Sequence, residues 1–161
     1  MFREMKRITQ ILSEEDTNRI MMTASSGVLA LTGDGGYTYA VPLSFAYEDS
    51  RIYFHCAKEG HKIDALNNNN KVSFCVIDKD EVIPEAFNTI YRSVIAFGRA
   101  RILDDDRERM EALESLIRKY SPAYASQGKK EIEKYWDKVC LVEIYVEHIT
   151  GKASRDFLSG S

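Results

Sequence analysis

The sequence is poor in cysteine, histidine and proline, and it has no long apolar run. Its three cysteines, Cys56, Cys75 and Cys140, are widely spaced and contain no CxxC pair. An odd number of cysteines excludes the paired disulfide framework of a small secreted domain. No apolar stretch approaches the roughly 20 residues of a membrane helix, and none near the N-terminus suits a signal peptide. We therefore expect a cytoplasmic protein with reduced thiols and no membrane contact.

Neither sign of charge is in large excess. The chain has 22 Lys and Arg against 25 Asp and Glu, so its net charge is −3. This balance argues against a nucleic-acid binder that depends on phosphate contacts. The chain also lacks a Walker-type phosphate loop and a GxSxG nucleophile elbow, so nothing supports a P-loop enzyme or a serine hydrolase.

The 161 residues are 44% hydrophobic and 11% aromatic, which suits one domain with its own core. We find no internal repeat and no linker. We therefore expect a single domain over residues 1–161, with its core at about 14–152 and a loosely ordered tail at 153–161.

Short apolar or alternating segments dominate the middle of the chain and predict strands. A Gly-rich turn at residues 33–36 favours a hairpin, and Pro42 in the returning strand indicates an edge or a bulge. Gly98 indicates a bend or a close backbone approach. Residues 79–90, around Pro84, are predicted as a loop. The six predicted strands are Val28–Leu31, Tyr37–Tyr47, Ile52–Ala57, Lys71–Asp78, Tyr91–Leu103 and Val139–Ile149.

Helix signals lie before the first of these strands and between later ones. Ser13 begins a capping box for a helix over Glu14–Thr23. The Asp104–Asp106 run caps a periodic helix that ends near Tyr120, and shorter helices are predicted at Ile63–Leu66 and Lys129–Asp137. The fold class is therefore α+β, mainly β, built on an antiparallel sheet or barrel with flanking helices.

The segment Lys58-Glu59-Gly60-His61-Lys62 lies where a predicted strand meets a predicted helix. A helix start offers unpaired N–H groups, Gly60 permits close backbone approach, and the lysines and His61 add cationic donors. These features favour a phosphate-binding turn. The alternative is a solvated turn with surface lysines.

His55 is the second candidate, because it faces away from Ile52, Phe54 and Cys56 on its strand. It could contact a ligand, or it could be a histidine satisfied by a structural hydrogen bond. His55, Cys56 and His61 have no fourth ligand at a standard spacing, so we predict no metal site.

Four blocks of sequence together resemble a known family. They are Tyr39–Phe45, Ile52–Ala57, Gly60–Lys62, and Tyr91–Val94 with Gly98. In this order and spacing they are similar to the pyridoxamine 5′-phosphate oxidase-like, FMN-binding split-barrel superfamily, and most of all to its nitroimidazole-resistance branch. The resemblance runs from about Glu14 to Lys152 and implies a six-stranded antiparallel split β-barrel.

The resemblance also implies a homodimer that binds FMN at its interface. Its implied cofactor-binding residues are Val41, Pro42, Leu43, Ser44, Phe45, His55, Gly60, His61, Lys62 and Ser93. Among these, the strand Val41–Phe45 would face the flavin ring, and Gly60–Lys62 would hold the phosphate. His55 is also the tentative catalytic residue, since an imidazole can orient an anionic ligand or donate a proton near neutral pH.

Two departures from the family argue against the oxidase activity itself. The oxidase itself uses arginine-rich contacts and a distinctive C-terminal segment, and neither is present here. The expectation is an FMN-dependent oxidoreductase similar to nitroimidazole reductases, with a small-molecule electron acceptor and NAD(P)H as the candidate donor. The alternatives are a non-catalytic flavin or haem sensor and, less favoured, a pyridoxamine 5′-phosphate oxidase.

Overall fold

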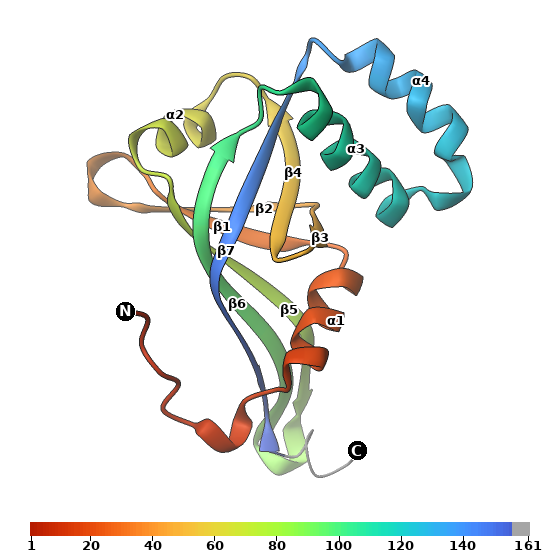
Figure 1. Cartoon of the computed structure of the whole chain (residues 1–161). Helices are drawn as coiled ribbons and strands as arrows, with labels where there is room; N and C mark the ends of the chain where they lie inside the picture. The colour runs from red at the N-terminus through yellow and green to blue at the C-terminus, as the bar shows by residue number, and fades with distance from the viewer. Residues whose placement is uncertain (156–161) are drawn as a thin grey trace.

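The computed structural model describes residues 1–155, apart from the side chain of Lys129, and its main feature is a strongly curled antiparallel sheet (Figure 1). Its strands are β1 Gly27–Thr32, β2 Thr38–Leu43, β3 Ala46–Glu48, β4 Arg51–Ala57, β5 Lys71–Ile83, β6 Asn88–Ile102 and β7 Val139–Ala153. The α-helices are α1 Glu14–Thr23, α2 His61–Asn68, α3 Asp106–Tyr120 and α4 Ala125–Tyr135. The structure is thus mainly β with flanking helices, as the sequence predicted.

The sheet has seven strands in the order β2-β1-β5-β6-β7-β4-β3, so the prediction of six strands is wrong. The predicted strand Tyr37–Tyr47 is in fact two strands, because the chain leaves one edge of the sheet at Leu43 and enters the other edge at Ala46. Only Ser44 and Phe45 join these edges. Since two linking residues span little distance, the sheet must curl until its edges meet at this corner.

The curled sheet is not a closed barrel. The strands β2 and β3 end the strand order, and β3 pairs with only the first three residues of β4, Arg51–Tyr53. Among residues 1–155, the outer edge of β2 and the outer edge of Phe54–Ala57, whose other edge pairs with β7, therefore have no strand partner. We call these two free edges the split. Pro42 lies on the edge strand β2, as its missing N–H predicted.

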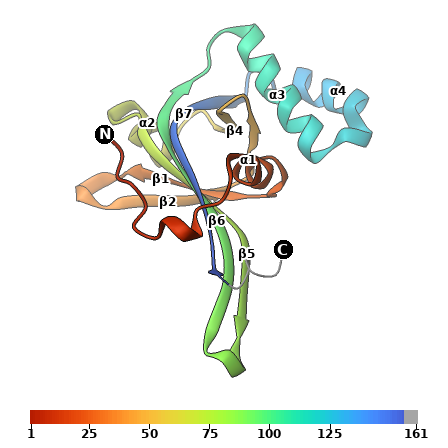
Figure 2. The same ribbon diagram turned by 60° about the horizontal axis from the view of Figure 1, so that its bottom comes forward.

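Strands β5 and β6 continue beyond the barrel as a two-stranded arm (Figure 2). The prediction of a loop at 79–90 is wrong, because Lys79 pairs with Arg92 and Ile83 pairs with Asn88. Pro84 begins a short 3-10 turn at the tip. Most side chains of the arm are exposed on both faces. The segment therefore lacks the alternation between buried and exposed residues that identifies a strand in sequence.

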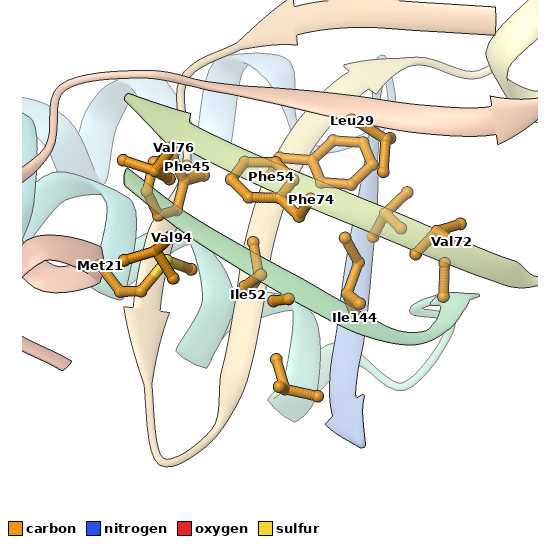
Figure 3. Packing of buried hydrophobic residues seen from close by; sticks show 14 of the residues in the cluster. Met21, Leu29, Phe45, Ile52, Phe54, Val72, Phe74, Val76, Val94 and Ile144 are labelled. Atoms are coloured by element: carbon orange, nitrogen blue, oxygen red, sulfur yellow. The ribbon is translucent and has the colours of Figure 1, made fainter. Parts of the chain in front are cut away.

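The core fills the inside of the curled sheet (Figure 3). Phe45 and Phe74 meet edge to face, with ring centroids 4.8 Å apart, among the buried side chains Leu29, Phe54 and Ile144. This apolar cluster supplies the main stabilisation, at roughly 25 cal/mol per Å² of apolar surface buried.

Gly98 lies where the pairing of β6 with β7 shifts register. A Cβ atom there would meet the Tyr145 carbonyl oxygen at 2.2 Å. The predicted close backbone approach is therefore confirmed, since no larger residue could occupy this position without displacing β7.

The helices lie on different sides of the sheet. The Ser13 hydroxyl accepts the Asp16 N–H at 3.0 Å at the start of α1, which confirms the predicted cap and helix. Helix α3 packs on β3, β4 and β7, with Ala112 and Leu116 buried against Leu141. None of the helices in residues 1–155 is long and apolar enough to cross a membrane.

Strand β7 extends further than the sequence indicated. It ends at Ala153, which is fully buried, and Ser154 is buried as well, so these two residues belong to the core. The remainder of the predicted tail from residue 156 lies outside the described residues.

Candidate functional site

A single tyrosine on α3 holds the corner where β2 ends and β3 begins. The Tyr120 hydroxyl accepts the Phe45 N–H at 2.9 Å. The same oxygen lies 2.7 Å from the Ser25 carbonyl oxygen and 2.9 Å from that of Phe45, and it can donate to either. The corner is therefore fixed from outside the sheet, and Ser44 is held exposed beside it.

The predicted flavin-facing segment Val41–Phe45 has side chains in three environments. Pro42 and Ser44 are exposed, whereas Val41 and Leu43 are half-buried against the core. Phe45 has no exposed surface, and its backbone N–H and carbonyl are both within hydrogen-bonding distance of Tyr120. Phe45 thus shapes the corner, while Pro42 and Ser44 present their side chains to the outside.

The start of α2 crosses from β4 to the opposite edge of the split. Only three residues separate His61 from the end of β4, yet its ring stacks on Tyr39 of β2, with centroids 4.2 Å apart. His61 Nε2 also lies 3.6 Å from a carboxylate oxygen of Asp34, on the β1–β2 hairpin. The predicted phosphate-binding turn therefore lies between the two free edges.

The backbone of this turn depends on Gly60. Its φ of 123° lies where only glycine is comfortable, although a Cβ atom would meet nothing within 4 Å. No side chain of residues 1–155 caps the helix that begins at His61, so the N–H groups of His61 and Lys62 remain available to an anion, while those of Ile63 and Asp64 donate to the Gly60 carbonyl. Lys62 follows, with Nζ 5.7 Å from the centre of the Phe54 ring.

A mostly apolar groove of about 780 Å³ lies beside the split, between β4 and the helices α3 and α4. We call it the helix-side pocket. Two predicted site residues, Ser44 and His55, line it. The others are Leu113, Leu116, Ile117, Tyr120, Ser121, Tyr124, Gln127, Gly128, Glu131, Ile132, Tyr135 and Val139. His55 is the only titratable nitrogen base among the lining residues. The pocket can therefore hold a flat apolar group against one imidazole.

The sequence reasoning missed the wall that α3 and α4 form. The periodicity of the helix that ends near Tyr120 predicts an apolar stripe of Met110, Leu113, Leu116, Ile117 and Tyr120 typical of core or interface, and the last four of these residues also line the pocket. The apolar stripe of this helix is wider than packing on the sheet alone requires. This width is the one sequence signal that could have indicated that the helix also lines a pocket.

Ser93 lies far from His55 within one chain. Ser93 pairs with Lys152 near one end of β7, and His55 pairs with Leu141 near the other end. These two partners are eleven residues apart on β7, which is roughly 36 Å along a strand. Figure 1 shows β7 running the length of the molecule between them. Within a single chain, the predicted site is therefore not one cluster.

Ser93 instead shares an outward face with Pro42. A row of cross-strand neighbours runs from Pro42 through Val28 and Cys75 to Ile95, two residues from Ser93. We call this surface the bare face, because its central residues are uncharged, while Lys71, Arg99 and Lys152 lie at its margin. Its residues are Val28, Ala30, Ala40, Pro42, Ser73, Cys75, Ile77, Ser93, Ile95 and Phe97. A largely apolar sheet surface with exposed Ile77 and Ile95 and charged residues at its margin is typical of an interaction site.

Comparison with known proteins gave one family and a set of similar folds. The family model described as pyridoxamine 5′-phosphate oxidase matches residues 13–153. No curated protein matches the chain. Among solved structures, a provisionally assigned 5-nitroimidazole antibiotic resistance protein from Bacteroides thetaiotaomicron is 23% identical, with a TM-score of 0.71 over 89% of this chain and 86% of that chain.

Two further solved structures are described as flavin-binding proteins. A FAD-binding protein from Mesorhizobium loti is 24% identical, with a TM-score of 0.64 over 90% of this chain and 97% of its own. A FAD and haem binding protein from Mycobacterium smegmatis is 20% identical, with a TM-score of 0.74 over 92% of this chain and 78% of its own. At these identities the likeness establishes a common fold.

Proposed function

Because this chain belongs to the pyridoxamine 5′-phosphate oxidase family, we propose that it binds FMN along the split and uses it as an oxidoreductase. The observation that carries the proposal is the position of the α2 start. A glycine turn, an uncapped helix N-terminus and Lys62 lie across the free edges, beside a pocket that contains His55.

The residues of the α2 start fit a phosphate. Lys58 and Lys62 supply positive charge, and the free N–H groups of the first helical turn supply directional donors. His61 adds a donor whose ring is already fixed by Tyr39 and Asp34. A monoester phosphate with two negative charges suits this set of donors better than a neutral group does.

The helix-side pocket fits a flat, largely apolar ring. Its walls are aliphatic and tyrosine side chains from α3 and α4, and its polar groups include Ser44 and His55 next to the split. These are the features of a cofactor pocket, in which a few polar groups orient an apolar body.

The proposed site is completed by a second copy of the chain. Ser93 is far from His55 within one chain, and it lies on the bare face with Ile95 and Pro42. Packing this face against the bare face of a second copy would remove its exposed apolar side chains from water. It would also bring Ser93 of one copy toward the split of the other. We therefore propose a homodimer with two equivalent sites.

Bound FMN would supply electron and hydride transfer, and the protein residues would hold and orient it. Lys62 and the α2 start would neutralise the phosphate. The exposed imidazole of His55, in the wall of the helix-side pocket, would donate a proton to a substrate bound beside the flavin ring. A nitroaromatic electron acceptor and NAD(P)H as donor are the proposed substrates.

Anaerobic reduction tests this activity. The FMN-loaded protein should lose its yellow absorbance with NADH or NADPH and regain it on addition of a nitroimidazole. The His55→Asn variant should still bind FMN through the α2 start, with lower affinity, and should regain absorbance more slowly when saturated with FMN. If the loaded protein resists both donors, the chain is a flavin carrier or sensor instead. The position of His55 in an apolar pocket then makes haem the next ligand to titrate.

A further inference from the structure

Two of the three cysteines face each other across the sheet. Cys56 on β4 pairs directly with Cys140 on β7, in the antiparallel register that also pairs Phe54 with Val142. Both side chains point into the barrel, where Cys140 is buried and Cys56 is half-buried. Both thiols are free, and the register places them on the same face of the sheet, side by side.

The backbone spacing at this pair suits a disulfide. Residues directly opposite in an antiparallel ladder have Cα atoms about 4.5 or 5.5 Å apart, depending on the type of pair. Disulfides span Cα distances of about 4.4 to 6.8 Å. A bond between Cys56 and Cys140 therefore requires no movement of the strands.

The two thiols differ in how readily they ionise. The hydrogen bond from Cys56, together with the nearby charges of Arg109, Lys58 and Lys62, lowers the pKa of Cys140 to about 7. The same hydrogen bond, with burial, raises the pKa of Cys56. Cys140 is thus the nucleophile near neutral pH, and Cys56 holds the proton.

Cys75 provides an internal comparison. It lies on the bare face, where its cross-strand neighbours are Val28 and Ile95, and burial raises the pKa of its thiol. It has neither an opposing cysteine nor a group that favours the thiolate. Any reaction specific to the Cys56–Cys140 pair should therefore leave Cys75 reduced.

We propose that Cys56 and Cys140 form a thiol–disulfide couple that a hydroperoxide oxidises. The Cys140 thiolate attacks a peroxide oxygen, the O–O bond breaks, and the leaving oxygen takes up a proton. Cys56 then attacks the resulting sulfenic sulfur, so that the S–S bond forms and the S–O bond breaks. The second oxygen leaves as water with the Cys56 proton. With hydrogen peroxide, two thiols lose two electrons and two protons, and two waters form.

The position of this couple connects it to the α2 start. Cys56 is followed by only one residue of β4 before the turn that carries Lys58 and Lys62. Oxidation removes the negative charge of the Cys140 thiolate from the surroundings of these lysines and fixes the end of β4 to β7. Their attraction for an anion is thereby increased in the oxidised form.

Peptide mapping tests the couple without reference to flavin. The full chain is reduced, freed of reductant, exposed to equimolar hydrogen peroxide just above neutral pH, alkylated and digested with trypsin. Cleavage after Lys and Arg places Cys56 in fragment 52–58, Cys75 in fragment 72–79 and Cys140 in fragment 139–152. We expect fragments 52–58 and 139–152 to be linked with the loss of two hydrogens, to separate with dithiothreitol, and to leave Cys75 alkylated.

Single substitutions sharpen the result. Cys75→Ala should keep the linked pair, whereas Cys56→Ala and Cys140→Ala should each abolish it. The wild-type map decides the question even if a variant fails to fold. The proposal is overturned if Cys56 and Cys140 both remain alkylated in excess peroxide, or if either one links to Cys75 instead.

Discussion

The ring of His61 stacks on that of Tyr39 at 4.2 Å and so joins the start of α2 to the far edge of the split. The two residues belong to elements that are not paired in the sheet, because β2 and β4 lie near opposite ends of the strand order. This contact determines where Lys62 and the first N–H groups of α2 lie. The proposed phosphate site therefore depends on a contact between the two free edges.

Replacing His61 should weaken FMN binding without unfolding the protein. The His61→Ala change removes one donor to the phosphate and the ring that positions the turn, so we expect the FMN dissociation constant to rise roughly 10- to 100-fold. Quenching of flavin fluorescence measures it. Arg107→Ala is the control, because Arg107 is an exposed cation at the start of α3 that pairs with Glu111 and does not line the helix-side pocket. Equal effects of the two changes would contradict the assignment.

A charge on the bare face should separate the dimer. Ile95 is exposed in one chain and would be buried in the proposed interface. Ile95→Glu would place an unpaired carboxylate there in both copies, so we expect the dimer dissociation constant to rise at least about 100-fold. Sedimentation velocity of the wild type and the variant checks this. The control Met22→Glu changes an exposed apolar residue on α1 and should leave the dimer intact. A wild type that sediments as a monomer would refute the proposed assembly.

The Tyr120 hydroxyl should contribute measurably to stability. Tyr120→Phe leaves the Phe45 N–H without its partner, and the carbonyl oxygens of Ser25 and Phe45 without a donor. We expect a loss of about 1 to 3 kcal/mol in the free energy of unfolding, measured by urea denaturation. Tyr124→Phe alters an exposed tyrosine just after α3 and should change stability by less than about 0.5 kcal/mol. If both variants unfold alike, the corner does not depend on Tyr120.

Lys119 should make stability depend on pH in the alkaline range. Burial lowers the pKa of its ammonium group from 10.5 to about 8, and Nζ lies 3.8 Å from the centre of the buried Phe45 ring. Between these two pKa values the unfolded chain binds more protons than the folded one, so stability rises with pH across this window. The cost of burying the charge is fully present below pH 8.

Lys119→Met should remove this dependence. Because the side chain is half-exposed, solvent screening reduces the expected gain at neutral pH to about 1 to 2 kcal/mol. The gain should vanish above pH 10.5, the ordinary lysine pKa. Urea unfolding from about pH 7 to 11, which spans both pKa values, measures both proteins, with the exposed Lys130→Met as a control. Parallel stability curves for the wild type and Lys119→Met would show that Lys119 is not the cause.

Local chemistry made some elements predictable. The Ser13 cap and the carboxylates of the first turn set the start of α1 at Glu14, as the sequence indicated. The prediction of an edge at Pro42 is confirmed, because the missing N–H of proline is a property of the residue itself and does not depend on distant contacts. Gly60 likewise indicated a turn into α2, because glycine adopts the positive φ that the structure has at this position.

Long-range contacts explain the failures. The division of Tyr37–Tyr47 into β2 and β3 depends on Tyr120, which is 75 residues away from Phe45 in sequence. The arm was missed because its residues face solvent on both sides and carry no alternation. The separation of Ser93 from His55 follows from the length of β7, which no motif reveals.

The central claim is that this chain recognises FMN through its phosphate at the α2 start. The most direct measurement is a parallel titration of the wild type and Lys62→Ala with FMN, FAD and riboflavin, which lacks the phosphate. We predict saturation at one FMN per chain, at least about tenfold weaker riboflavin binding, and a selective loss of FMN affinity in Lys62→Ala. Riboflavin affinity should be the same in both proteins. Equal affinity of the wild type for FMN and riboflavin, or no flavin binding, would contradict the account.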